Sequence, residues 1–131
     1  MSDKSDILRA FNTYFSEFFD YVIASRPDDA ALRAAKKNLD AIRMANPVIV
    51  LRVWKNRICG PYAAELAEGD ISFFIRAQNQ APSNESAARI VDSIRAAVKS
   101  MSDREKCDVV TFLRNLSTLS DQYYFLQSQN F

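Results

Sequence analysis

The sequence contains no histidine and only two glycines among its 131 residues. Without histidine, the chain lacks the most common general base and the most common nitrogen ligand for metals. The glycines, Gly60 and Gly69, are too few for a glycine-rich phosphate-binding loop. The carboxylates do not follow the spacing of a calcium-binding loop. The sequence therefore predicts a non-enzymatic protein with no cofactor and no metal site.

Proline and long apolar runs are scarce as well. Four prolines and two glycines offer little material for the many tight turns of an all-β sandwich or barrel. No apolar run approaches the roughly 18 residues of a membrane helix. The first six residues are polar and do not begin a signal sequence. We therefore expect a soluble protein that makes no contact with a membrane.

The two cysteines, Cys59 and Cys107, indicate a reduced, intracellular protein. Lys55 and Arg57 lie close to Cys59 in sequence, and positive neighbours lower a thiol pKa. A nucleophilic thiol would still need a base, and no histidine is present to serve as one. We therefore interpret both cysteines as small packed side chains. The compartment disfavours a disulfide between them, although the sequence alone does not decide the point.

Apolar residues recur at three- and four-residue steps along most of the chain, which is typical of amphipathic helices. We predict an all-α fold, a single compact bundle of about five to six helices that forms one domain over residues 1–131. The helices are expected over residues 6–25, 27–45, 47–58, 62–68, 84–101 and 103–126.

Polar residues and prolines mark the helix ends. Ser5 or Asp6 is expected to cap the first helix, and Pro27 to end it. Asn46 suits a left-handed cap at the end of the second helix, and Gly69 is expected to follow the last residue of the helix over 62–68 as its C-terminal cap. Ser102, followed three residues later by Glu105, predicts a capping box at the start of the last helix.

Two short segments remain ambiguous between helix and strand. Residues 47–53 are rich in β-branched side chains, but the helical period continues to Ile58, so we favour a helix. Residues 70–76 are expected to form either a further helical turn or an extended piece. Residues 78–84 carry no charge and no large aliphatic side chain, and are predicted to form a flexible loop.

A cationic segment is the first candidate for a binding surface. Between Arg33 and Arg57, seven lysines and arginines accompany one acid, Asp40, which gives this segment a charge of +6 and leaves −5 on the remainder. Such a segment either attracts an acidic partner or pairs with the acidic helices of its own chain. Trp54 and Tyr62 would add stacking if single-stranded nucleic acid were bound. The candidate partner-binding residues here are Arg43, Arg52, Lys55 and Arg57.

The C-terminal segment 121–131 is the second candidate, because it reads DQYYFLQSQNF. Its aromatic residues either pack back on the domain or anchor into a neighbouring protein. Tyr124, Phe125 and Phe131 are the candidate partner-binding residues of this aromatic tail.

Four segments of the chain resemble a family of small proteins encoded by nucleocytoplasmic large DNA viruses, the giant viruses. They are FNTYFSEFFDYVIASRPDDAALRAAKKNL, ANPVIVLRVWKNRICGPYAAELAEGDISFFI, IRAAVKSMSDREKCDVVTFLRNL and LSTLSDQYY, of which the GDISFFI string is the most specific. The matching positions are Pro27, Asp28, Asp29, Asn46, Pro47, Trp54, Tyr62, Gly69, Asp70, Ile71, Ser72, Phe73, Phe74, Ile75, Asn115, Leu116, Leu119, Ser120, Tyr123 and Tyr124.

The resemblance implies a viral origin and a place in the host cytoplasm, the virus factory or the virion. It brings no activity, cofactor or catalytic residue with it. We therefore expect a helical protein that binds other viral proteins or itself as a homo-oligomer, as a structural or assembly component of the virion. The alternative is an accessory module that binds nucleic acid through the cationic segment around residues 33–57.

Overall fold

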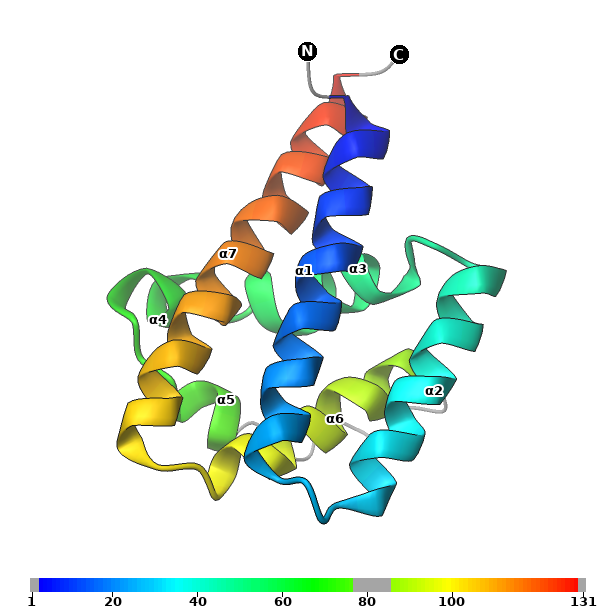
Figure 1. Ribbon diagram of the computed structural model, residues 1–131. Helices are drawn as coiled ribbons and strands as arrows, with labels where there is room; N and C mark the ends of the chain where they lie inside the picture. Colours follow the sequence, from blue (N-terminus) through cyan, green and yellow to red (C-terminus); the bar gives the residue numbers. More distant parts are fainter. Residues whose placement is uncertain (1–2, 77–85, 130–131) are drawn as a thin grey trace.

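The computed structural model describes residues 3–76 and 86–129 (Figure 1). Within them the chain is helical with no β-strand, so the predicted all-α fold is confirmed. Both ambiguous segments are helical, which brings the number of α-helices in the described part to seven. In order, the elements are α1 (Lys4–Ser25), α2 (Ala30–Ala45), α3 (Ile49–Trp54), the π-helical turn η1 (Lys55–Cys59), α4 (Ala63–Glu68), α5 (Ser72–Arg76), α6 (Ser86–Lys99) and α7 (Asp103–Ser128).

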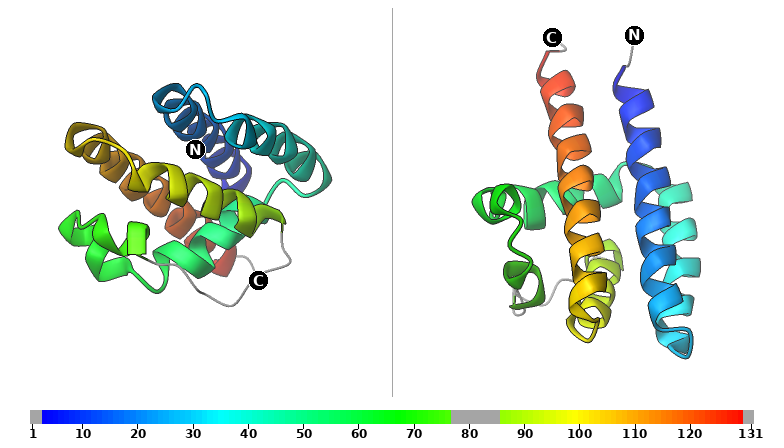
Figure 2. Two further views of the ribbon diagram at one scale, coloured as in Figure 1. Left: turned by 90° about the horizontal axis from the view of Figure 1, so that it is seen from below. Right: turned by 60° about the vertical axis from the view of Figure 1, so that its left-hand side comes forward.

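The long helices α1 and α7 lie side by side and run in opposite directions, and this pair makes the most extensive helix–helix contact (Figure 1). The helix α3 and its continuation η1 cross behind them, while α6 packs against α2, α3 and α5. The two outer ends of α1 and α7 extend past the other helices (Figure 2). We call these ends, residues 4–10 and 119–128, the arm, and the remainder the body.

The centre of the body is an aromatic cluster. Phe11, Phe15, Phe18 and Phe19 of α1 are completely buried. The ring of Phe15 packs edge-on against Trp54, with ring centroids 6.1 Å apart. Each such side chain stabilises the fold by about 1.5–3 kcal/mol through burial alone. Trp54 also donates its indole N–H to Ser117 Oγ at 3.0 Å, so its one polar atom is satisfied.

Two predicted helix ends are wrong in detail. The N-cap of α1 is Asp3, not Ser5 or Asp6, and Asp6 lies at the third helical position, where it completes a capping box. Asn46 does end α2, but its backbone is extended at φ −150°, not left-handed. The physical reason is Pro47, because the proline ring clashes with the backbone of the preceding residue and favours an extended conformation there. The Asn46 side chain then accepts a hydrogen bond from Val48 N at 3.2 Å.

Other predicted ends are confirmed. Ser102 and Glu105 form the expected capping box of α7. Gly69 ends α4 in the left-handed region at φ +72°, which only glycine adopts without strain. The C-terminal segment is not a separate tail, because residues 121–128 are the last turns of α7. The predicted loop 78–84 and Phe131 lie outside the described residues.

Candidate functional site

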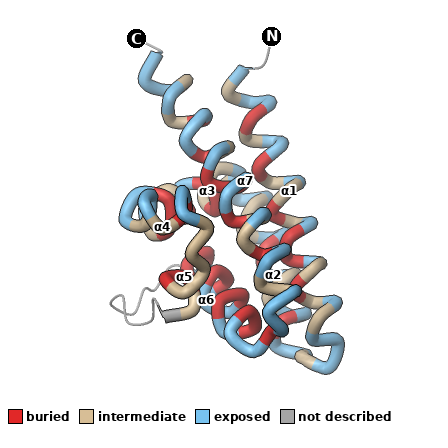
Figure 3. Tube along the Cα trace, turned by 90° about the vertical axis from the view of Figure 1, so that its left-hand side faces the viewer, coloured by how far each residue is buried: buried red, intermediate tan, exposed pale blue. Residues whose placement is uncertain are grey.

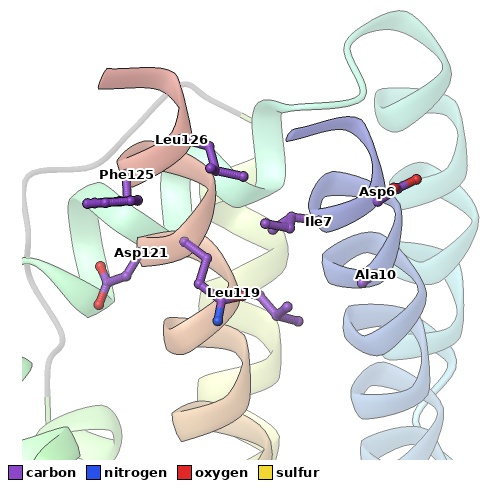
Figure 4. Close-up of a pocket in the computed structure, with 8 residues that line it drawn as sticks. Asp6, Ile7, Ala10, Leu119, Asp121, Phe125 and Leu126 are labelled. Carbon is purple, nitrogen blue, oxygen red and sulfur yellow. The ribbon is translucent and has the colours of Figure 1, made fainter. Parts of the chain in front are cut away.

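A groove of about 620 Å³ lies between the two helices of the arm. Its lining comes from the first turns of α1 and the last turns of α7, the two ends of the described chain (Figure 4). The lining residues are Asp6, Ile7, Ala10, Leu119, Asp121, Gln122, Phe125 and Leu126.

The interior of the groove is apolar. Ile7 from α1 and Leu126 from α7 point toward each other across it (Figure 4). Phe125 stands at its edge with 63% of its surface exposed. In the described part of the chain, only Phe125 and Met44 are large apolar side chains with such exposure. Exposed apolar surface beside a groove is typical of a site that binds another molecule.

Carboxylates stand on both walls of the groove. Asp6 projects from α1 and Asp121 from α7, and both point away from its centre (Figure 4). None of the residues that line the groove is a lysine or an arginine. Each carboxylate is paired with a cation of its own chain, Asp6 with Arg9 at 3.6 Å and Asp121 with Lys55 at 2.7 Å, so an occupant would meet an apolar centre flanked by two ion pairs.

Asp121 also connects the groove to the body. Its Oδ1 accepts a hydrogen bond from Lys55 Nζ at 2.7 Å and another from Cys59 Sγ at 3.0 Å. Burial alone would raise the pKa of Asp121, but the bonds from Lys55 and Cys59 outweigh it and hold the pKa below its ordinary value. Asp121 therefore stays ionised at neutral pH.

The π-helical turn η1 presents both of these donors to α7. Its defining bond runs from Gly60 N to Lys55 O at 2.9 Å, one residue longer than an α-helical bond. π-helical turns occur frequently at functional sites. Here the turn carries Lys55 and Cys59 on the side that contacts Asp121.

The two cysteines differ in their burial. Cys59 is buried, as predicted, and burial together with its bond to Asp121 raises the pKa of its thiol to about 11. The positive charge of Lys55 acts in the opposite direction but is outweighed. Cys107 is exposed, so its predicted burial is wrong. It lies on the opposite side of α7 from the buried Val109 and Leu113. Both thiols are free.

The cationic segment is largely bound to its own chain. Arg43 donates to Asn12 O at 2.8 Å and Ser16 Oγ at 2.7 Å, and pairs with Asp40. Lys55 pairs with Asp121 through the hydrogen bond from its Nζ. The cations with internal partners are Arg33 (Pro27 O), Lys36 (Asp20), Arg43 and Lys55.

The side chains of three cations of the segment, Lys37, Arg52 and Arg57, have no hydrogen bond or ion pair within residues 3–76 and 86–129. Of the four candidate residues in this segment, only Arg52 and Arg57 therefore remain available to a partner. Trp54 is completely buried and cannot stack on a nucleic-acid base. Tyr62 is stacked on Phe73 at a centroid distance of 4.7 Å.

The aromatic residues at the end of α7 divide between the two predicted roles. Tyr123 is buried and Lys4 Nζ lies 5.6 Å from the centre of its ring, so it packs back on α1. Tyr124 is half-buried and contacts Tyr123 edge-on at 5.6 Å. Phe125 alone is strongly exposed. The sequence pattern thus identified Phe125 but missed Ile7, Leu119 and Leu126, which complete the groove.

Arg95 is the one buried cation in the described residues. Its Nη1 pairs with Asp92 at 2.7 Å, and its guanidinium lies over the ring of Phe74 at 5.2 Å. Burial lowers the pKa of Arg95. Its Nε has neither a partner nor accessible surface, so no ligand can reach it. Arg95 therefore belongs to the packing of α6 against α5.

The described residues show neither a cluster of metal ligands nor a helix suited to cross a membrane. Across residues 3–76 and 86–129, no three metal-binding side chains converge. None of the helices described is both long enough and apolar enough to cross a membrane. Comparisons of the chain with protein-family models, curated proteins and solved structures found no match. The resemblance to the giant-virus family therefore stays a prediction.

Proposed function

We propose that this protein is a non-enzymatic helical module that binds another protein through the groove of the arm. The observation that carries this proposal is Phe125, which is exposed at the edge of an apolar groove that residues 3–76 and 86–129 leave open. Aromatic anchors that enter or border such pockets supply much of the binding free energy of protein interfaces. The resemblance to giant-virus proteins would make the partner a viral protein, as a structural or assembly component of the virion.

The chemistry of the titratable groups agrees with a binding role. The thiol of Cys59 has a pKa of about 11 and donates to Asp121, so it is protonated and weakly nucleophilic at neutral pH. The two carboxylates of the groove stand on its walls in ion pairs with Arg9 and Lys55, which suits a polar rim around an apolar contact.

A photo-crosslinking experiment tests the proposal. A photoreactive phenylalanine analogue replaces Phe125 in one variant and Arg104, an exposed residue at the opposite end of α7, in a control variant. Both are expressed in the cells in which the protein is made, and lysates are treated with nuclease. Protein adducts at position 125 that are absent at position 104 support the proposal. Equal labelling at both positions, or adducts with nucleic acid alone, contradicts it.

The contact peptide of each adduct is then synthesised and titrated against the purified protein. We expect Phe125→Glu to weaken this binding at least about tenfold, because burying the ring contributes more than about 1.4 kcal/mol. Gln127→Glu is the matched control, since it adds the same charge at an exposed neighbouring position of α7. Equal losses in the two variants would indicate a charge effect and not a contact with Phe125.

A further inference from the structure

An open apolar groove and an exposed aromatic ring lie next to each other on the arm. The groove of about 620 Å³ is within the range of about 300–1,000 Å³ that is typical of ligand clefts. Phe125 lines it from the edge, and its ring points away from α1 and is mostly exposed (Figure 4). The ring therefore does not fill the groove of its own chain. A partner that covers both features must offer a pocket for the ring and an apolar side chain for the groove.

The arm is a pair of helices that extends past the rest of the molecule (Figure 2). Among its large apolar side chains, only Ile7 and Tyr123 are buried. Helices bury their apolar stripes against neighbouring elements, and two helices alone leave the sides of their seam open. A second pair of helices laid across the groove would complete a four-helix arrangement, in which apolar side chains of all four helices share one core.

The two carboxylates that line the groove are balanced within the chain. Asp6 is paired with Arg9 at 3.6 Å, and Asp121 with Lys55 at 2.7 Å. Two such grooves can therefore face each other without bringing unpaired like charges together, which would otherwise oppose a contact between identical surfaces. Since the paired carboxylates do not select a basic partner either, the apolar shape of the groove decides what fits.

The size of this surface favours a contact that uses it twice. A fully covered phenylalanine buries about 150–250 Å², and 63% of Phe125 is still exposed. A stable dimer buries about 800 Å² per partner, from about 20–30 residues on each side. The groove has only eight lining residues, so one ring in one groove falls far short of this area. A two-fold contact covers two rings and two grooves, which doubles the apolar area gained from the same small surface.

We propose that the groove is occupied by the same surface of a second copy of this chain, related to the first by a two-fold axis. Phe125 of each copy then enters the groove of the other. Such a contact requires one surface that carries both a projecting side chain and a pocket, and the arm carries both. The pairing rests on the proposed role of the groove as a protein-binding site and specifies the partner as the chain itself. The assembly closes at two copies.

The test uses the full chain and substitutions at exposed positions only. Phe125→Ala removes the ring, and Ala10→Trp fills the groove from its α1 wall while leaving the ring in place. Gln127→Ala and Ala24→Trp are the matched controls, because both positions are exposed and do not line the groove. Sedimentation velocity follows each protein from low micromolar concentration to about 1 mM, the range of dissociation constants expected for a small contact. Thermal unfolding confirms that each variant is folded.

The wild type and both controls are expected to pass from monomer to dimer as concentration rises, and to form nothing larger. Phe125→Ala should weaken dimerisation at least about a hundredfold, because each dimer loses two ring contacts that each contribute at least about tenfold. Ala10→Trp should weaken it to a similar extent, because both grooves are filled. An equimolar mixture of these two variants should dimerise more strongly than either variant alone, since the ring of one meets the open groove of the other.

Four results would overturn the two-fold pairing. The wild type could remain monomeric to about 1 mM, or it could assemble beyond the dimer. Phe125→Ala or Ala10→Trp could dimerise as well as its matched control. The mixture of the two variants could associate no more strongly than each variant alone. A monomeric wild type whose position 125 still crosslinks to a different protein would overturn the pairing while leaving the proposed function intact.

Discussion

The helices α1 and α7 run through both the body and the arm, yet their apolar residues are buried to different degrees in the two regions. On α1, Phe11 and Phe15 are completely buried in the body, whereas Ile7 in the arm keeps 9% of its surface exposed. On α7, Leu116 is completely buried and Phe125 is 63% exposed. Figure 3 shows this gradient as red positions that become sparse toward the two chain ends. The comparison teaches that α1 and α7 contribute more buried apolar surface to the fold in the body than in the arm.

Alanine substitutions should separate the two regions most strongly. We expect Phe15→Ala to lower the free energy of unfolding by about 3–5 kcal/mol, because the cavity would lie inside a packed aromatic cluster. Leu126→Ala, which removes a half-buried side chain of the arm, should cost less than about 1.5 kcal/mol. Urea denaturation at equilibrium measures both. Similar losses in the two variants would mean that the arm belongs to the cooperative core.

Thiol reactivity should distinguish the two cysteines nearly as strongly. At pH 8 a thiol with a pKa of about 11 is ionised to a far smaller extent than an ordinary one. Cys59 should therefore react with a disulfide reagent at least about a hundredfold more slowly than Cys107, and its burial should slow it further. The variants Cys107→Ser and Cys59→Ala isolate each rate. A fast reaction of Cys59 would show that the contact between η1 and α7 opens readily.

The bond between Trp54 and Ser117 should have an intermediate effect. Trp54→Phe removes the indole N–H and leaves the buried Ser117 Oγ without its donor, which should cost about 1–3 kcal/mol. Ser117→Ala in the Trp54→Phe background should then cost less than it does in the wild type. A double-mutant cycle in urea provides the test. Strictly additive losses would argue that the hydrogen bond contributes nothing.

The contact between Asp121 and the π-helical turn should have the smallest effect and a specific pH dependence. The pKa of Asp121 is lower in the folded state, so the contribution of its carboxylate is present above about pH 4 and is lost as pH falls through the folded pKa. Asp121→Asn should cost about 0.5–1 kcal/mol at pH 7, because the carboxylate is 56% exposed and screened by solvent.

Unfolding measured from pH 7 down to about pH 3 checks this dependence. The difference between the wild type and Asp121→Asn should shrink as the pH falls. Glu17→Gln is the control for the loss of one negative charge, because Glu17 is exposed and its side chain has no hydrogen bond or ion pair within the described residues. A constant difference at all pH values would assign the effect to packing and not to ionisation.

The helices of this fold could be predicted from the sequence because helical periodicity is a local property. The capping box at Ser102 and the left-handed Gly69 were visible for the same reason. The prediction for Asn46 was wrong because the proline after it decides its backbone. The exposure of Cys107 could have been predicted from the sequence, since the apolar Val109 and Leu113 mark the buried face of α7 and Cys107 lies on the opposite face.

The groove could not be predicted in this way. It depends on Ile7 and Leu126, which lie at opposite ends of the chain and meet only when α1 and α7 pair. Only Phe125 gave a local signal, as an aromatic residue in a polar segment. The π-helical turn was equally hidden, because its apolar period continues to Ile58 as in an ordinary helix, and only the backbone bond from Gly60 reveals the additional residue.

The additional residue of the π-helical turn η1 restricts insertions and deletions in this part of the chain. Trp54 is attached to Ser117 and Cys59 to Asp121, so α7 holds the turn at two points. Deleting one residue between them would close the turn into an α-helix and rotate the next part of the chain by about 100°. One of the two attachments would then have to break. Insertions and deletions among relatives of this protein should therefore be absent between residues 54 and 59, and any alignment of such relatives can be anchored there.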